Sequence, residues 1–293
     1  MMTRALGTTG LEVGPLGLGA GPLGDPAMDE REVERLLVGA LDLGVTLVDT
    51  ARSYGLAEER IGRHLARRRS EVVLSTKVGY GIDGHADWTG PCVAAGIDEA
   101  MRRLRTDHLD IVHLHSCPLE TLRRGDVLVA LLDAVVAGKV RVAAYSGEGE
   151  ALAWAAASGA FGAVQTSVNL CDRASLATVV PGTRAHGLGV LAKRTLCNGV
   201  WRDETLPPQP DKAEYWRRWH ALDLPLTGWD PLELAVRFAA HAPGVDAALV
   251  GTTRVENLRR TVELAARGRL PADVLAALDD RYRETGNAWP GVV

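Results

Sequence analysis

The sequence predicts a (β/α)8 TIM barrel, in which eight parallel strands close into a ring and a helix follows each strand. Short apolar runs of strand character alternate with segments of helical periodicity along the chain. A length of 293 residues is long for an ordinary domain but normal for one such barrel. A doubly wound open sheet would need a glycine-rich phosphate turn, and GLGAG at 17–21 lacks the G-x-G-x-x-G spacing. We therefore expect a single barrel domain over residues 1–293.

Local patterns predict each element in chain order, beginning with a hairpin at 4–13. Apolar, β-branched runs predict strands at 15–20, 45–51, 72–79, 109–115, 140–146, 163–169, 189–194 and 246–252. Helical periodicity predicts helices at 29–44, 58–68, 92–104, 120–138, 151–158, 173–187, 229–241, 254–268 and 271–285. Asp29 and Gly44 are suitable residues to begin and end the first helix, and Pro181 is expected to break the helix that contains it. A long insertion at about 196–228, rich in Pro, Trp and charge, follows the seventh strand and should cover the mouth of the barrel.

Composition excludes several classes of function. A net charge of −4 without a basic patch argues against a nucleic-acid or anionic-membrane partner. No apolar run reaches membrane-spanning length, and the first ten residues lack the apolar core of a signal peptide. The four cysteines lie far apart without a C-x-x-C pair, which favours reduced thiols. We expect a cytoplasmic protein that acts on a small molecule, and nothing in the sequence indicates its oligomeric state.

Four polar residues follow one another at the ends of the second, third and fourth predicted strands. Asp49, Lys77 and His115 each stand where a strand ends, and Tyr54 lies five residues after Asp49. Strand ends of this kind meet at the catalytic face of a barrel. An ammonium about 4 Å from a phenol, at an effective dielectric near 20, favours the phenolate by about 4 kcal/mol. Alone, Asp49 could cap a loop and Tyr54 could be a rim aromatic, but together the four residues indicate a proton-donating site.

A metal site is the competing interpretation of the fourth strand, because His113 and His115 alternate onto one face. A metal hydrolase would need further ligands at the ends of later strands. Those ends read AYSG, SVNL and VGTT and contain no His, Asp or Glu. We therefore predict no metal, with His113 one layer deeper in the core.

Several segments resemble the aldo-keto reductase family over nearly the whole chain. The segments that carry the resemblance are GVTLVDTARSYGLAEERIG (44–62), STKVG (75–79), LDIVHLHSCP (109–118), GKVRVAAYSG (138–147) and VQTSVNL (164–170). The motifs are specific in combination and in order. The family spacing also selects His115 over His113.

The resemblance implies a barrel enzyme that reduces aldehydes or ketones with a nicotinamide cofactor, usually NADPH, without a Rossmann motif. By position, Tyr54 would protonate the carbonyl oxygen as hydride reaches the carbon. Asp49 and Lys77 would tune Tyr54, and His115 would orient the carbonyl. Tight cofactor binding without turnover, in a cofactor-sensing protein, is one alternative. Oxidation of a sugar or polyol by the same site is another.

The cofactor positions implied by the resemblance are partly altered. Ser146 and Gln165 match residues that hydrogen-bond the carboxamide, but the usual Asn is Gly147. Lys193 replaces the aromatic residue that usually stacks on the nicotinamide, and Lys193 or Arg194 could contact the ring plane or a phosphate.

The loop after the last strand, VGTTRVENLRR at 250–260, also departs from the family pattern. Its candidate cofactor residues are Gly251, Thr252, Thr253 and Asn257. Gly251 stands where a phosphate-binding lysine is usual, and Asn257 stands near the usual arginine for the 2′-phosphate. Arg254 or Arg260 could compensate. NADP is therefore our expectation, with NAD as the alternative.

Substrate contacts are expected from the 80–90 loop, the insertion and the C-terminal tail. Trp88 and Trp201 are the candidate substrate residues, although a loop tryptophan is more often a packing residue.

Overall fold

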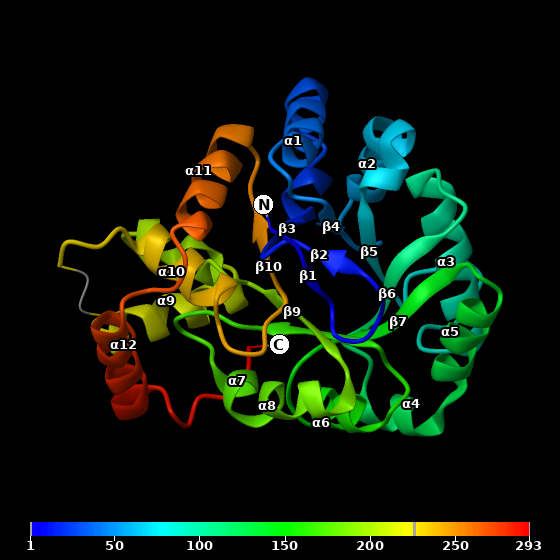
Figure 1. Cartoon of the computed structure of the whole chain (residues 1–293). Coiled ribbons are helices and arrows are strands. Elements are labelled where there is room, and N and C mark those ends of the chain that lie inside the picture. The colour runs from blue at the N-terminus through cyan, green and yellow to red at the C-terminus, as the bar shows by residue number, and fades with distance from the viewer. Residues whose placement is uncertain (1, 225–226, 293) are drawn as a thin grey trace.

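The computed structural model describes residues 2–224 and 227–292, and it contains a closed barrel of eight parallel strands (Figure 1). The strands are β3 (Leu16–Gly19), β4 (Leu47–Asp49), β5 (Val73–Val78), β6 (Leu109–His115), β7 (Val140–Ser146), β8 (Ala163–Ser167), β9 (Gly189–Lys193) and β10 (Ala247–Gly251). They pair in sequence order, and β10 closes the ring against both β9 and β3. The predicted (β/α)8 barrel is confirmed.

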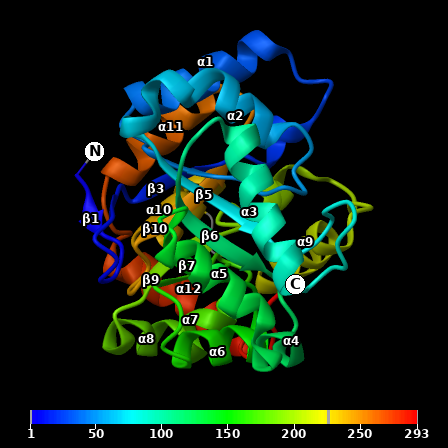
Figure 2. The ribbon, with the colours of Figure 1, turned by 90° about the vertical axis from the view of Figure 1, so that its right-hand side faces the viewer.

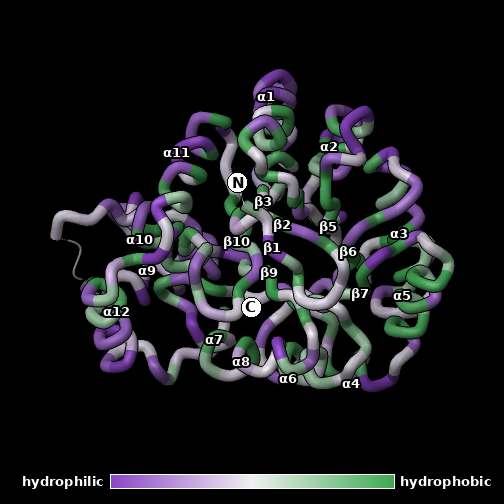
Figure 3. Tube along the Cα trace, viewed as in Figure 1, coloured by the Kyte–Doolittle hydropathy of each residue, from purple (hydrophilic) through white to green (hydrophobic). Residues whose placement is uncertain are grey.

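Helices surround the strands (Figures 1 and 2). They are α1 (Glu30–Asp42), α2 (Ala57–Leu65), α3 (Gly90–Leu104), α4 (Leu119–Arg124), α5 (Asp126–Val136), α6 (Gly149–Ala157), α7 (Ala174–Thr178), α8 (Val180–Thr183), α9 (Pro210–Leu222), α10 (Pro231–Ala240), α11 (Val255–Ala266) and α12 (Ala272–Thr285). Short 3-10 turns are η1 (Gly21–Gly24), η2 (Ala66–Glu71), η3 (Arg184–His186) and η4 (Cys197–Arg202). In Figure 3 these helices carry both hydrophobic and hydrophilic segments, as expected for elements with one face on a core.

Two predicted helices are divided. The segment at 120–138 was expected to be continuous, which is wrong, because Gly125 adopts φ +89° and separates α4 from α5. A left-handed conformation is readily available to glycine and ends a helix. The segment at 173–187 breaks as predicted near Pro181, into α7, α8 and η3.

The N-terminal hairpin is present as β1 (Arg4–Ala5) and β2 (Glu12–Val13). Its Leu6, Leu11 and Val13 are buried in an apolar cluster with side chains from the barrel strands. The hairpin therefore closes the barrel from one end. The insertion after β9 contains η4 and α9, and its residues 225–226 lie outside the described part of the chain.

Alternation along the strands sets the position of the polar residues. Leu47, Ile111 and Leu191 belong to the apolar cluster of the hairpin and barrel strands, and each is two residues before a polar residue on the same strand. Because side chains of a strand alternate between faces, Asp49, His113 and Lys193 share the faces of Leu47, Ile111 and Leu191. Each of these strand faces therefore passes from an apolar base towards a polar mouth at its carboxyl end.

Candidate active site

A buried ion pair joins Asp49 at the end of β4 to Lys77 on β5. The Lys77 Nζ donates to Asp49 Oδ2 at 2.6 Å and to the Thr50 carbonyl at 2.8 Å. The other carboxylate oxygen, Oδ1, accepts from Ser75 Oγ at 2.7 Å and Gln165 Nε2 at 2.9 Å. Both charged side chains are 5% exposed or less. The pair is therefore rigid, and its hydrogen bonds extend across the barrel from β4 and β5 to β8.

Mutual attraction keeps this buried pair ionised. Burial by itself would raise the pKa of Asp49, but the charge of Lys77 and the hydrogen bonds from Lys77 and Ser75 outweigh it and lower that pKa. Burial would lower the pKa of Lys77, but the charge of Asp49 and its hydrogen bond to Lys77 outweigh it and raise that pKa. Lys77 is therefore a fixed positive charge beneath the mouth of the barrel.

Tyr54 lies above this charge. The Lys77 Nζ is 5.0 Å from the centroid of the Tyr54 ring. Tyr54 is held in a tight turn, with its N–H bonded to the Ala51 carbonyl at 3.0 Å. Gly55 adopts φ +49°, and a side chain there would collide with the backbone of Gly24. This close approach of the turn after β4 to the loop after β3 fixes the position of the phenol.

His115, at the end of β6, lies beside Tyr54 at the mouth. The two rings meet edge to face with centroids 6.2 Å apart. Tyr80, from the loop after β5, stacks on His115 at 5.6 Å, and its hydroxyl lies 2.8 Å from His115 Nδ1. Burial lowers the pKa of His115 to about 3, and the charges of Lys77 and Lys193 act in the same direction. The imidazole is therefore neutral at physiological pH, and Nε2 is left for a ligand.

His113 lies one layer deeper than His115 on the same strand. It is fully buried, and its Nε2 is 3.0 Å from Ser75 Oγ. Burial lowers the pKa of His113 to about 4, partly opposed by the charge of Asp49. Its Nδ1 has no hydrogen-bond partner within residues 2–224 and 227–292. This histidine is a neutral core residue in the described structure.

Ser146 and Gln165 belong to the same network as the ion pair. Ser146 Oγ donates to Gln165 Oε1 at 2.9 Å, and Gln165 in turn donates to Asp49. The absence of a side chain at Gly147, directly after Ser146, has a structural cause. A side chain at Gly147 would meet the ring of Tyr145, whose hydroxyl donates to the Cys117 carbonyl. The amide side chain that the family resemblance implies here would therefore collide with Tyr145.

These residues border a cavity of about 510 Å³ at the mouth of the barrel. The predicted site residues that line it are Asp49, Tyr54, His115, Gln165, Lys193, Arg194, Trp201 and Gly251. Lys77 and Ser146 lie behind the lining, each bonded to a lining residue. The insertion contributes Asn198, Trp201 and Arg202, so it borders the mouth as expected.

Lys193 and Arg194 are already engaged by the protein. Lys193 Nζ is 3.3 Å from Glu148 Oε1, and burial lowers the pKa of Lys193 although Glu148 opposes the shift. The same Glu148 oxygen accepts from the N–H and hydroxyl of Ser167. Arg194 donates to the carbonyl of Val292, which brings the C-terminal tail to the edge of the cavity.

Four predicted residues lie outside this cavity. Thr253 borders a separate depression of about 440 Å³ beside the N-terminus of α1. Thr252 bonds within its own turn, and Asn257 is exposed on α11. Trp88 packs on Tyr80, with ring centroids 5.6 Å apart. It therefore contacts the site only through Tyr80, which stacks on His115.

Tyr80 and Glu148 were missed among the sequence-predicted site residues. Tyr80 falls in the 80–90 loop that was expected to contact substrate, but nothing in the pattern paired it with His115. Glu148 follows the Ser146–Gly147 motif directly, and a carboxylate there could have been matched to Lys193.

Two general properties of the described residues bear on the chemistry. Within residues 2–224 and 227–292, no group of three or more His, Cys, Asp or Glu side chains is arranged to hold a metal ion. In the same residues, no helix has the length and apolar character needed to cross a membrane.

Comparisons with known proteins agree on one family. The model of the aldo/keto reductase family matches residues 15–283. L-galactose dehydrogenase of Arabidopsis thaliana is 26% identical over 310 aligned residues, covering 98% of this chain and 96% of the relative. Aldo-keto reductase YhdN of Bacillus subtilis is 26% identical over 298 residues, covering 90% and 88%. The solved aldo-keto reductase of Bacillus halodurans superposes with a TM-score of 0.81 at 23% identity over 96% of each chain, which supports the fold.

Proposed function

The chain belongs to the aldo/keto reductase family, and we propose that it reduces an aldehyde or ketone to an alcohol with NAD(P)H, Tyr54 supplying the proton. The observation that carries this proposal is the buried Asp49–Lys77 pair beneath Tyr54, at a cavity that His115 also lines. A cation held in this position stabilises the phenolate that remains after proton transfer. Positioned proton donors of this kind contribute about 10²–10⁴ in rate.

His115 is the proposed orienting group. Its depressed pKa keeps the ring neutral, so Nε2–H donates to the carbonyl oxygen when Nδ1 accepts a hydrogen bond. Tyr80 is placed to make that bond, because its hydroxyl is 2.8 Å from Nδ1. Tyr80 would then set the tautomer of His115. Both oxygen-directed groups, Tyr54 and His115, would meet the substrate from the same end of the cavity.

The cavity also fits the nicotinamide cofactor of the family. When bound, that cofactor would supply the hydride for the carbonyl carbon. Gln165, which lines the cavity, has a second amide N–H beyond the one given to Asp49, and Ser146 behind it holds the amide oxygen of Gln165 in place. Gly251 has no side chain, so the cofactor can approach the backbone at the rim of the cavity. Arg194 adds a cation for a phosphate.

NADPH is the proposed form because Arg254 borders the depression next to α1 and forms no ion pair within the described residues. Of the three carboxylates that border the depression, Glu32 is paired with Arg35 and Asp29 caps α1, while Glu256 forms no ion pair within the described residues. Arg254→Gln should weaken NADPH binding at least about fivefold and leave NADH binding unchanged, as fluorescence titration would reveal. Arg259→Gln, on α11 just after Arg254 and outside the lining of the depression, is the control. Equal effects on both cofactors would contradict a 2′-phosphate contact.

The oxidative direction is a second candidate, because one relative is named L-galactose dehydrogenase. A sugar hydroxyl would use the same residues in reverse, with Tyr54 as the proton acceptor. The Tyr54–Lys77–Asp49 arrangement serves either direction.

The test is steady-state turnover followed by absorbance at about 340 nm. Purified protein is mixed with NADPH or NADH and a panel of aldehydes and ketones, and with NADP⁺ or NAD⁺ and a panel of sugars. Carbonyl-dependent oxidation of the reduced cofactor supports the proposal. Tight cofactor binding without turnover across both panels would reject it in favour of a cofactor-sensing protein.

A further inference from the structure

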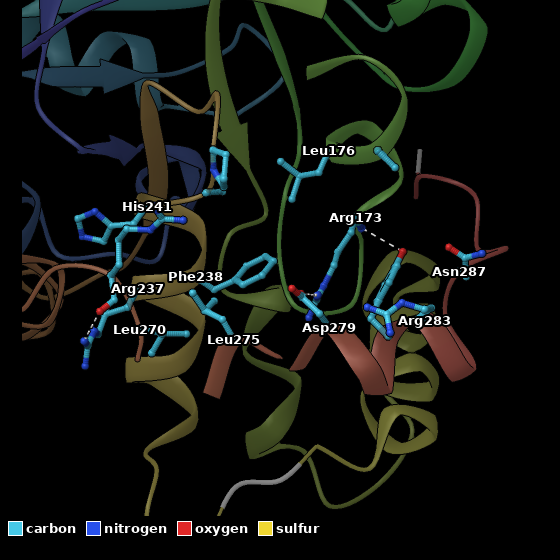
Figure 4. Close-up of a pocket in the computed structure, with 15 residues that line it drawn as sticks. Arg173, Leu176, Arg237, Phe238, His241, Leu270, Leu275, Asp279, Arg283 and Asn287 are labelled. Carbon is cyan, nitrogen blue, oxygen red and sulfur yellow. Dashed lines mark hydrogen bonds and ion pairs between the residues drawn. The ribbon is translucent and has the colours of Figure 1, made fainter. Parts of the chain in front are cut away.

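A second cavity lies outside the barrel, between α7, α10 and α12 (Figure 4). Its volume is about 410 Å³, within the range of small-molecule sites. None of its lining residues borders the cavity at the barrel mouth. The proposed reduction therefore leaves this cavity unused.

Most of its wall is apolar. The apolar side chains that line it are Leu176, Ala177, Phe238, Ala242, Pro243, Leu270 and Leu275. In Figure 4, Phe238, Leu275 and Leu176 come from three different elements around the same space. Such a wall suits the hydrocarbon body of a ligand, because removing apolar surface from water is favourable.

Arg173 gives the cavity a buried positive charge. Its guanidinium carbon lies 4.5 Å from the centroid of the Phe238 ring and 4.6 Å from that of Tyr282. Nη1 donates to Asp279 at 2.7 Å and Nη2 to the Leu278 carbonyl at 3.3 Å, but Nε has no partner within the described residues. Burial lowers the pKa of Arg173 even though Asp279 opposes the shift. The protein thus compensates this cation incompletely, as Asp279 is itself half exposed.

The rim adds further positive charge. Arg237, Arg269 and Arg283 also border the cavity, whereas Asp279 is its single lining carboxylate among the described residues. Arg237 is paired with Glu233 and Arg283 with Asp280, while the Arg269 side chain forms no ion pair within residues 2–224 and 227–292. The lining therefore combines an apolar wall with an excess of guanidinium groups at its edge.

We propose that this cavity binds a small monocarboxylate with an apolar body, such as a medium-chain fatty acid. The hydrocarbon would lie against Leu176, Phe238 and Leu275, and the carboxylate would face the guanidinium groups of the rim. Guanidinium and carboxylate are matched in shape and charge. Asp279 on the wall disfavours a doubly charged head group such as a phosphate monoester.

The test is calorimetric titration of the full chain with octanoate, octylamine and octyl phosphate. Octanoate should bind at least tenfold more tightly than octylamine, and more tightly than octyl phosphate. Saturating NADPH should change its affinity less than twofold, because the cavities share no residue. Equal binding of the amine, tighter binding of the phosphate, or displacement by NADPH would overturn the proposal. If sedimentation showed that octanoate makes the protein dimerise, the cavity would be a contact between two copies of the chain. That result would also overturn the proposal.

Variants locate the binding. Leu275→Trp and, from another wall, Leu176→Trp should each fill the cavity and weaken octanoate binding at least tenfold, with folding checked by thermal melting. The double variant Arg269→Gln and Arg283→Gln removes two charges of the rim and leaves the apolar wall unchanged. It should weaken octanoate binding at least fivefold. The matched control is Arg267→Gln with Arg281→Gln, which lie outside the lining. Unchanged affinity in the Arg269 and Arg283 variant, or an equal loss in the control, would reject the site.

Discussion

Asp49 and Lys77 depend on each other, because each would otherwise be a buried charge without a counter-ion. Lys77→Met should destabilise the protein by about 3 kcal/mol, since removal of one partner leaves the other uncompensated. Adding Asp49→Asn to that variant should recover at least half of the loss. The free energy of unfolding in urea measures both values. A double variant no more stable than Lys77→Met would show that the pair is not coupled as the geometry indicates.

Tyr80 is expected to act through His115 rather than on the substrate. Tyr80→Phe removes the hydroxyl at His115 Nδ1 but keeps the stacked ring. We expect kcat to fall about three- to tenfold with little change in the melting temperature, because the tautomer of His115 is no longer fixed. Ser53→Ala is the control, since Ser53 contacts the same hydroxyl at 3.3 Å without touching His115. Full activity of Tyr80→Phe would remove this role.

At this scale the sequence predicts the residues that lie at strand ends but misses two that follow them, Tyr80 and Glu148. Asp49, Lys77 and His115 could be brought together because parallel strands end at the same rim of a barrel. Tyr80 approaches His115 from a loop whose path depends on Gly79 and Gly81, both with positive φ. Glu148 meets Lys193 through a similar turn, and no periodic pattern describes such paths.

At the scale of elements, period-two alternation accounts for the layers of the barrel. The predicted strands agree with the observed ones to within about two residues at each end. The same alternation places His113 one step inside His115 on β6. The division at Gly125 was not predicted, because a single glycine within a helical pattern is often tolerated.

His113 on β6 makes the stability of the barrel depend on pH. Its pKa is about 4 in the folded protein against 6.5 for an ordinary histidine, so below pH 6.5 the unfolded chain binds a proton that the folded chain excludes. Stability should therefore fall as pH falls, by about 2 kcal/mol between about pH 6.5 and 4.5, and this contribution levels off below the folded pKa.

Urea unfolding of His113→Gln and wild type at several pH values measures this term. The variant should lose stability less steeply than wild type over that interval. His85→Gln, at an exposed loop position, should keep the wild-type slope. Identical slopes for wild type and His113→Gln would show that His113 does not titrate in this way.

For the whole molecule, the insertion and the C-terminal tail converge on one side of the mouth. Asp172 accepts from the Val292 N–H at 2.8 Å, and Arg218 of α9 donates to the Pro290 carbonyl at 3.0 Å. Arg194 donates to the Val292 carbonyl and also lines the cavity. The sequence predicts that both segments belong to this face, but these bonds join positions far apart in the chain, and local patterns carry no information on them.

The proton-donating residues and the expected cofactor contacts differ in how closely they follow the pattern implied by the family resemblance. The residues proposed to donate the proton match in type and spacing the pattern that the family resemblance implies, whereas Gly147 and Lys193 do not. Tyr145 and Glu148 explain these two departures locally, as one fills the space and the other pairs with the lysine. The proposed chemistry therefore rests on Tyr54 rather than on the altered cofactor contacts.

Single-turnover reduction by Tyr54→Phe tests that claim most directly. Cofactor affinity is first measured by tryptophan fluorescence with whichever of NADPH and NADH binds wild type more tightly. We expect the variant to bind within about twofold of wild type and to reduce the carbonyl at least about 100-fold more slowly. Equal cofactor binding with less than about a threefold loss of rate would contradict Tyr54 as the proton donor.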